Sequence, residues 1–298
     1  MPPAPILPTR QACHGGVRKM ELFVDESDAL VHTSRFDSRT LNVEGCMNNR
    51  YGSLAALVYD LDKPIGRTFG TEIEFYLSRL SDCRGPILEP GVGNGRLLIP
   101  LVEAGLSVEG FDASEEMLER CRAHCRARNL SPRLDRMRFE DFAYDHAFDA
   151  IVVPLGSFQL IGDFTDALMV LKRFHNHLAP GGRLILDLDP ISDFIGGGAR
   201  LRSWPTGDGD LITLQEQPVT IDHIAQRKVS HLRYERWRDS RLVETELELF
   251  TLRWWGINEF QLALETAGFS DVVISGNHEH GRGPTCEDWI ITFEGRRS

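Results

Sequence analysis

Hydrophobic positions along the chain follow two different periods, and the change between them divides the sequence. Between residues 85 and 190, short apolar runs alternate with segments whose apolar positions recur every three to four residues, as in an α/β fold. From 199 to 253, apolar and polar residues alternate singly, as in Thr245–Leu249, which predicts successive antiparallel strands. A last helical segment then ends at Gly268. The pattern predicts a doubly wound α/β sheet with an antiparallel β insertion before the last helix.

From this change of period and from composition, we predict that the chain is divided into four consecutive segments. Residues 1–42 form an N-terminal extension that we expect to be partly disordered, because its first 19 residues are rich in proline and lack periodicity. A core with an N-terminal helical cover spans 43–198, and an antiparallel unit follows at 199–253. Residues 254–298 complete the core with a helix and a hairpin. Whether residues 1–19 belong to the folded chain is left open.

A glycine-rich stretch is the most informative motif. Ile87 and Leu88 lead into Glu89-Pro90-Gly91-Val92-Gly93-Asn94-Gly95, a helical segment follows, and a second strand ends on Asp112. An acidic residue about twenty positions after such glycines is placed to meet ribose hydroxyls. The spacing is E-x-G-x-G-x-G, and Glu89 would repel a pyrophosphate. A nucleoside cofactor with a cationic amino-acid part, S-adenosylmethionine, fits this charge better.

The stretch resembles the first motif of class I S-adenosylmethionine-dependent methyltransferases of the small-molecule N- or O-methylating type. That resemblance implies a seven-stranded Rossmann-like sheet, with Glu89 and the glycines at the methionine end of the cofactor and Asp112 at its ribose. It also implies an adenine pocket made by Met117 and by the pair Asp141 and Phe142 at the end of a strand over 137–142, with Leu155 near the sulfonium. The implied cofactor-binding residues are Tyr51, Tyr59, Glu89, Gly91, Gly93, Gly95, Asp112, Met117, Asp141, Phe142 and Leu155.

Several roles stay open at this level. Tyr51 and Tyr59 either fold over the cofactor, as tyrosines before the first motif do in the resembled enzymes, or merely pack. Ser157 and Gln159 follow a buried strand and either touch substrate or cap the next helix. In the resembled enzymes an insertion like 199–253 forms a substrate lid. Catalytic residues are not identified; the candidates are Tyr59, Ser157 and His231, and His278 and Asp189 are further candidate bases.

Composition excludes some classes of function. A net charge of -11 argues against a nucleic-acid substrate, which clustered Lys and Arg would have to bind. No apolar run approaches the ~20 residues of a membrane span, and the N-terminus lacks the apolar core of a signal peptide, so we expect a cytoplasmic protein without membrane partners. The six cysteines form no C-x-x-C pair, and His278, Glu279 and His280 lack a third ligand nearby, so we expect no metal.

Together these observations predict an S-adenosylmethionine-dependent methyltransferase that moves a methyl group to a nitrogen or oxygen of a small metabolite. The alternative is a non-catalytic S-adenosylmethionine-binding regulatory module. A homodimer, the acceptor molecule and its reacting atom are left open.

Overall fold

A computed structural model describes residues 51–195 and 198–298, all of which belong to a compact unit spanning residues 43–298. The predicted N-terminal extension, residues 1–42, lies outside the described residues. Among the residues that are described, no helix is both long and apolar enough to cross a membrane.

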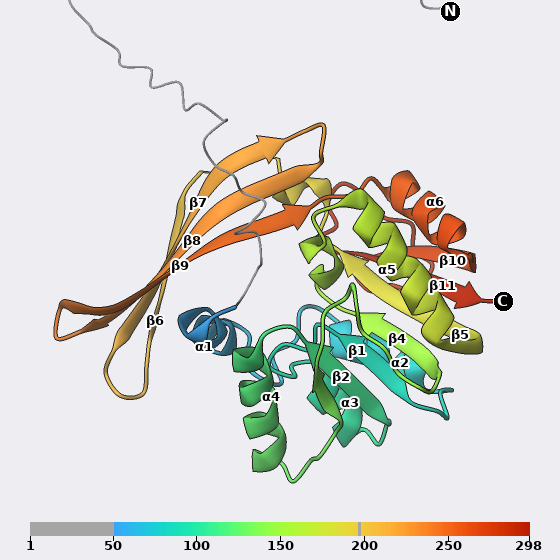
Figure 1. Ribbon diagram of the computed structural model, residues 1–298, viewed down its shortest axis with the longest axis horizontal. Coiled ribbons are helices and arrows are strands. Elements are labelled where there is room, and N and C mark those ends of the chain that lie inside the picture. Colours follow the sequence, from blue (N-terminus) through green and yellow to red (C-terminus); the bar gives the residue numbers. More distant parts are fainter. Residues whose placement is uncertain (1–50, 196–197) are drawn as a thin grey trace, which may run out of the picture. The chain divides into compact units, whose positions relative to one another are not determined.

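A seven-stranded sheet forms the centre of this unit, with strand order β10-β11-β5-β4-β1-β2-β3 (Figure 1). Neighbouring strands are parallel except β11, which runs antiparallel to both β5 and β10. Near-continuous apolar runs form the inner strands because helices cover both of their faces. The predicted doubly wound, Rossmann-like sheet is therefore confirmed. The strands are β1 (Ile87–Pro90), β2 (Val108–Asp112), β3 (Leu134–Arg136), β4 (Phe148–Val153), β5 (Leu178–Leu188), β10 (Phe269–Gly276) and β11 (Ile291–Arg297).

Alternate residues of the central strands enter two separate hydrophobic clusters. On β5, Leu184 and Leu186 join the cluster with α5 and α6, whereas Ile185 joins the cluster with α2, α3 and α4. Each strand residue points to the face opposite its neighbour, so one strand anchors both helical layers. The helices are α1 (Ser53–Asp62), α2 (Glu72–Leu80), α3 (Leu98–Glu103), α4 (Glu115–Ala127), α5 (Phe164–His177) and α6 (Ile257–Ala267), with short 3₁₀ turns η2 (Ser157–Leu160) and η3 (Ile191–Asp193).

The predicted insertion is a separate four-stranded antiparallel sheet, here called the second sheet. It consists of β6 (Arg200–Pro205), β7 (Leu211–Asp222), β8 (Arg227–Arg238) and β9 (Arg241–Arg253). One of its faces packs on α1, where Leu54 and Val58 meet Ile212, Leu214 and Leu232. The pairing of β7 with β8 has a register shift between Pro218 and Thr220.

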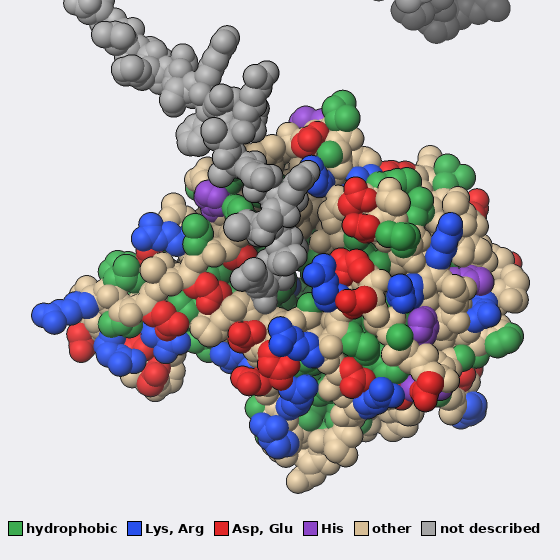
Figure 2. Space-filling view, in the orientation of Figure 1, with side chains coloured by type: hydrophobic (Ala, Val, Ile, Leu, Met, Phe, Trp, Pro, Cys, Tyr) green, Lys and Arg blue, Asp and Glu red, His purple; other side chains and the backbone are tan. Residues whose placement is uncertain are grey.

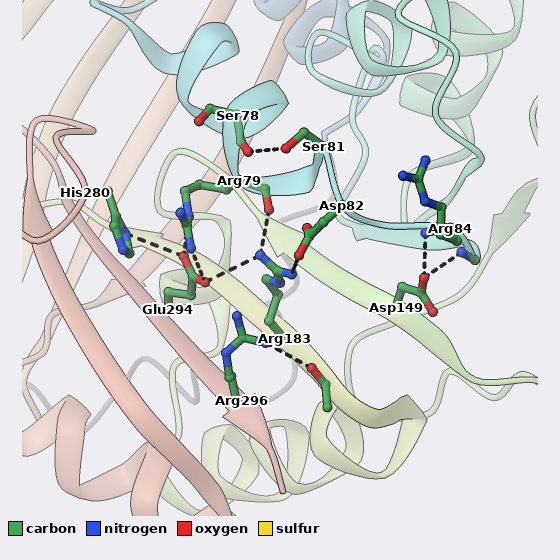
Figure 3. A network of polar contacts seen from close by, with 12 residues as sticks. Ser78, Arg79, Ser81, Asp82, Arg84, Asp149, Arg183, His280, Glu294 and Arg296 are labelled. Atoms are coloured by element: carbon green, nitrogen blue, oxygen red, sulfur yellow. Dashed lines mark hydrogen bonds and ion pairs between the residues drawn. The ribbon is translucent and has the colours of Figure 1, made fainter.

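Ion pairs connect the C-terminal end of α2 to strands β5 and β11 of the central sheet (Figure 3). Arg79, in the last turn of α2, makes two hydrogen bonds to Glu294 on β11, of 2.8 and 2.9 Å. Arg183 on β5 pairs with Asp82 just beyond that helix.

On the face of the molecule shown in Figure 2, Lys and Arg side chains are interspersed with Asp and Glu.

Candidate active site

A cavity of about 880 Å³ opens at the carboxyl ends of β1 and β2. This is the edge at which α/β sheets bind their ligands. We call it the large cavity, and Gly91, Gly93, Asp112 and Met117 are among its lining residues. Gly91 adopts φ 69°, and a Cβ there would lie 3.2 Å from the Phe139 ring, so glycine keeps the wall open.

Asp112 ends β2 and organises the neighbouring turns. Its Oδ2 accepts the Gly93 N–H at 2.9 Å and its Oδ1 accepts the Ser114 N–H at 2.9 Å. Burial raises the pKa of this carboxyl, although the backbone N–H groups oppose the shift. Ser114 caps α4 by accepting the Met117 N–H at 3.1 Å. The carboxylate therefore joins the glycine turn, β2 and α4 at the wall of the large cavity.

Glu89 lies at the end of β1, directly before the glycines, and is 2% exposed. Its Oε2 has no hydrogen-bond partner among the described residues. Arg96 does not neutralise it by direct pairing, because Arg96 binds Glu72 through both terminal nitrogens, at 2.5 and 2.7 Å. Burial raises the pKa of Glu89 well above its usual range, and the charge of Arg96 only partly opposes this shift. A buried carboxyl oxygen without a partner is suited to a cationic ligand group.

A second cavity of about 260 Å³, the small cavity, lies between α1 and the second sheet. Tyr51 and Tyr59 line both cavities, and their ring centroids are 6.1 Å apart at 84°. Burial raises the pKa of Tyr51 well above its ordinary value, so the phenol stays protonated. The two tyrosines thus form a border shared by the large and small cavities.

Asp189 lines the small cavity just after the end of β5. Gln159, fully buried, holds its backbone through two hydrogen bonds: Asp189 N–H to Gln159 Oε1 at 2.8 Å and Gln159 Nε2 to the Asp189 carbonyl at 3.3 Å. Burial raises the pKa of the Asp189 carboxyl to about 6, and the charge of Lys63 opposes that shift. Asp189 is therefore a carboxyl group that titrates close to neutral pH beside a cavity.

The sequence-based assignments of Phe142 and His231 are corrected by the positions of these residues. Phe142 does not line the large cavity; it is fully buried and stacked on Phe111 at 5.0 Å, because β3 ends at Arg136 and a turn follows. Phe139 lines the cavity instead, together with Asp141. His231 faces away from the small cavity, since Ser230, Leu232 and Tyr234 line it and neighbouring strand residues point to opposite faces.

Leu155, expected beside the sulfonium, lines neither cavity. It has a left-handed φ of 47° and donates its N–H to Asp187 Oδ2 at 3.2 Å. Ser157 does line the large cavity, and its Oγ donates to the Pro154 carbonyl at 3.0 Å. The carboxyl end of β4 therefore borders the site through Ser157 rather than Leu155.

The side chain of His278, a further candidate base, is fully buried, with Nε2 3.1 Å from Asp187 Oδ2. Burial lowers the pKa of His278, but the hydrogen bond and charge of Asp187 raise it more, so the net shift is upward. Within 51–195 and 198–298, no group of three His, Cys, Asp or Glu side chains is arranged to hold a metal ion. His278 therefore belongs to a structural network and faces neither cavity.

Residues 87–182 match the family model described as "Methyltransferase domain", in agreement with the resemblance that the sequence predicted.

Individual relatives agree with this assignment. The chain is 30% identical over 155 residues to the cypemycin N-terminal methyltransferase of a Streptomyces species. The aligned region covers 48% of this chain and 58% of that protein. It is 29% identical over 171 residues to glycine N-methyltransferase of Rattus norvegicus, covering 52% and 58% respectively. The chain thus spans less than two thirds of the length of these curated relatives.

Solved structures extend the likeness in fold beyond this segment. An S-adenosylmethionine-dependent methyltransferase from Clostridium acetobutylicum superposes with a TM-score of 0.66 at 19% identity, covering 81% of this chain and 96% of that one. An amino pentose methyltransferase from Micromonospora echinaspora, solved with S-adenosylmethionine bound, gives a TM-score of 0.61 at 18% identity, covering 84% and 99%. The fold of 81–84% of the chain is therefore similar to that of these enzymes.

Proposed function

We propose that this chain is an S-adenosylmethionine-dependent methyltransferase that methylates a nitrogen atom of a small metabolite. The observation that carries the proposal is the shared border of the two cavities at Tyr51 and Tyr59, with Asp189 beside the smaller one. The large cavity takes the cofactor, and the small cavity takes the acceptor. Residues 199–253 act as the lid over the acceptor.

The residues of the large cavity, together with Glu89 directly before its glycines, suit this cofactor. Glu89 does not line the cavity but offers a buried oxygen to the ammonium of the methionine part, and Gly91 and Gly93 let the ligand lie against the backbone. Asp112 keeps lone pairs for ribose hydroxyls beside its two backbone bonds, and Phe139 offers an aromatic face to adenine. When bound, the cofactor supplies the electrophilic methyl group, and the protein supplies alignment.

Asp189 favours nitrogen as the acceptor atom. An amine attacks only through its free lone pair, so a proton must leave it before or during transfer. A carboxylate with a pKa near 6 is ionised at neutral pH and can hold the ammonium form and then take that proton. The two curated relatives and the amino pentose enzyme, whose names denote methylation of amino compounds, support this choice.

The protonated Tyr51 phenol is not a candidate for the base that removes the proton from the acceptor. Because burial keeps this hydroxyl neutral, it can donate a hydrogen bond but cannot act as a base. Asp189 is then the group of the small cavity best suited to proton removal. We retain the cytoplasmic location as a prediction from the sequence, and a homodimer as an open alternative.

The test is an assay of transfer of an isotopically labelled methyl group to a panel of small amines, phenols and carboxylic acids, read by mass spectrometry. We expect label on amines only, and loss of at least about a hundredfold in kcat for Asp189→Asn. Asp208→Asn, in an exposed turn, is the control and should leave the rate unchanged. Binding of S-adenosylhomocysteine without transfer to any acceptor would instead favour the regulatory module.

A further inference from the structure

The charged groups that line the small cavity do not all pair with one another. Arg202 pairs with Asp62 at 3.1 Å, and Lys228 pairs with Glu216 at 3.8 Å. Of the charged residues lining this cavity, the remaining ones are Lys63, Arg200, Asp189 and Asp193. Unlike the first two pairs, these have no ion pair among the described residues.

Lys63 and Asp189 are close enough to influence each other, since the charge of Lys63 acts on the Asp189 carboxyl, yet no ion pair joins them. The Lys63 ammonium lies 4.8 Å from the centroid of the Tyr59 ring, so it is held at the border of the two cavities. Arg200, at the start of β6, lies opposite Glu216 on β7 but forms no ion pair among the described residues. Two cations therefore remain without an ion pair, one directly after α1 and one on the second sheet.

The acidic groups come from the other side of the cavity. Asp189 follows β5, and Asp193 lies in η3. The Asp189 carboxylate also abuts Gly156, because a Cβ there would lie 2.9 Å from Asp189 Oδ2, and the next residue, Ser157, lines the large cavity. Asp189 thus lies on the side of the small cavity next to Gly156 and Ser157, whereas Lys63 directly follows α1 and Arg200 starts β6.

We infer that the acceptor carries both an amine and an anionic group, with the amine beside Asp189 and the anion, a carboxylate or a phosphate, bound by Lys63 and Arg200. This inference rests on the proposed function and specifies its substrate class. The amine of such a zwitterion would pair with Asp189, and its anion would pair with Lys63 and Arg200, which have no ion pair of their own among the described residues. The cavity volume of about 260 Å³ limits the part of the acceptor that it holds to a small group. The amine then faces the methyl donor, while the anion fixes its direction.

Matched acceptor pairs test this inference. β-Alanine is compared with propylamine for a carboxylate, and phosphoethanolamine with ethanolamine for a phosphate. Transfer of label is measured together with binding of each compound, by titration calorimetry, to protein saturated with S-adenosylhomocysteine. We expect the anionic member of at least one pair to have a KM or Kd lower by about tenfold or more, and the pair that responds identifies the anion.

Two variants link that preference to the structure. Lys63→Met and Arg200→Met should each abolish most of the difference in KM and Kd between the anionic compound and its partner without the anion. Arg241→Met, at the far β8–β9 turn, is the matched control and should change nothing. Equal affinity for both members of both pairs, or a preference that survives both variants, would overturn the inference. Failure of transfer to every amine, with the binding preference intact, would contradict the proposed function alone.

Discussion

The backbone N–H of Tyr51 donates a hydrogen bond of 3.0 Å to Oε1 of Glu248, a residue 197 positions away on β9. The Tyr51 carbonyl in turn accepts from Ser114 Oγ at 2.8 Å, beside Asp112. Glu246, two residues earlier on the same strand, accepts the Leu54 N–H at 3.0 Å. Because Gly52 offers α1 no capping side chain, the second sheet caps this helix, and Tyr51 is fixed between the second sheet and the wall of the large cavity.

Removal of the Glu248 carboxylate should loosen this border. In Glu248→Ala we expect the Kd for S-adenosylhomocysteine and the KM for the acceptor each to rise about tenfold, because a hydrogen bond to a charged group contributes about 1.5–3 kcal/mol. Titration calorimetry and initial rates measure these quantities. Glu244→Ala, which removes an exposed 3.5 Å contact with Ser53 and an ion pair of 3.1 Å with Arg236 on β8, is the matched control. Equal effects of the two variants would show that Glu248 does not hold the site.

Asp112→Ala should weaken cofactor binding by about 10- to 100-fold, since it removes both the acceptor of the Gly93 N–H and the group proposed to bind ribose. Asp135→Ala on the neighbouring β3 removes a carboxylate that pairs with Arg133 and does not line either cavity. Calorimetric titration of both variants with S-adenosylhomocysteine distinguishes a local role from a change of net charge. Unchanged affinity in Asp112→Ala would remove this residue from the site.

Substitution of Phe139 and of Phe142 by alanine should affect different quantities, cofactor affinity for Phe139 and stability for Phe142. Phe142→Ala opens a hole in the core and should reduce the free energy of unfolding by about 3–5 kcal/mol. Phe139→Ala should cost less stability but raise the Kd for S-adenosylhomocysteine, because this ring lines the large cavity. Urea denaturation and calorimetry of both variants measure the two quantities. The reverse ranking would restore the original assignment of Phe142 to adenine.

Asp189 should impose a pH dependence on kcat. With a pKa of about 6, the carboxyl is protonated at lower pH and cannot accept a proton, so log kcat should rise with pH up to about 6 and then level off. In Asp189→Asn, the rise of log kcat with pH should disappear, together with most of the activity. A wild-type profile that is flat between pH 5 and 7 would contradict the assignment of the base.

The same residue should affect stability in the opposite sense. Its carboxyl has a higher pKa in the folded chain than the usual value of 3.8, so the folded state retains the proton between about pH 4 and pH 6 and loses stability as pH rises through that window. Asp189→Asn does not titrate and should be more stable than the wild type at pH 7, by about 3 kcal/mol, but not at pH 4. Urea denaturation at the two pH values measures this difference.

The sequence predicted those parts of the molecule that depend on local pattern. Glu89, the glycines and Asp112 lie within one strand-turn-helix-strand unit, so their spacing alone places them together. The change from helical to period-two pattern likewise located the second sheet. Phe139 and Phe142 could not be separated in this way, because both follow the end of β3 and only the turn decides which ring reaches the cavity.

Long-range contacts account for what the sequence could not predict. Whether His231 or its neighbours face the small cavity depends on the register of β7 and β8, which shifts at Pro218. The burial of His278 depends on Asp187, 91 residues earlier. Lys63 and Arg200 carry no local motif; they become notable only when the structure shows which charges around the small cavity are already paired.

A crystal structure with S-adenosylhomocysteine tests most directly the claim that a methyl donor in the large cavity faces an acceptor in the small one. The account predicts the nucleoside between Asp112 and Phe139, and the sulfur at the border formed by Tyr51 and Tyr59, directed toward Asp189. A ligand bound elsewhere, or a sulfur directed away from the small cavity, would contradict it.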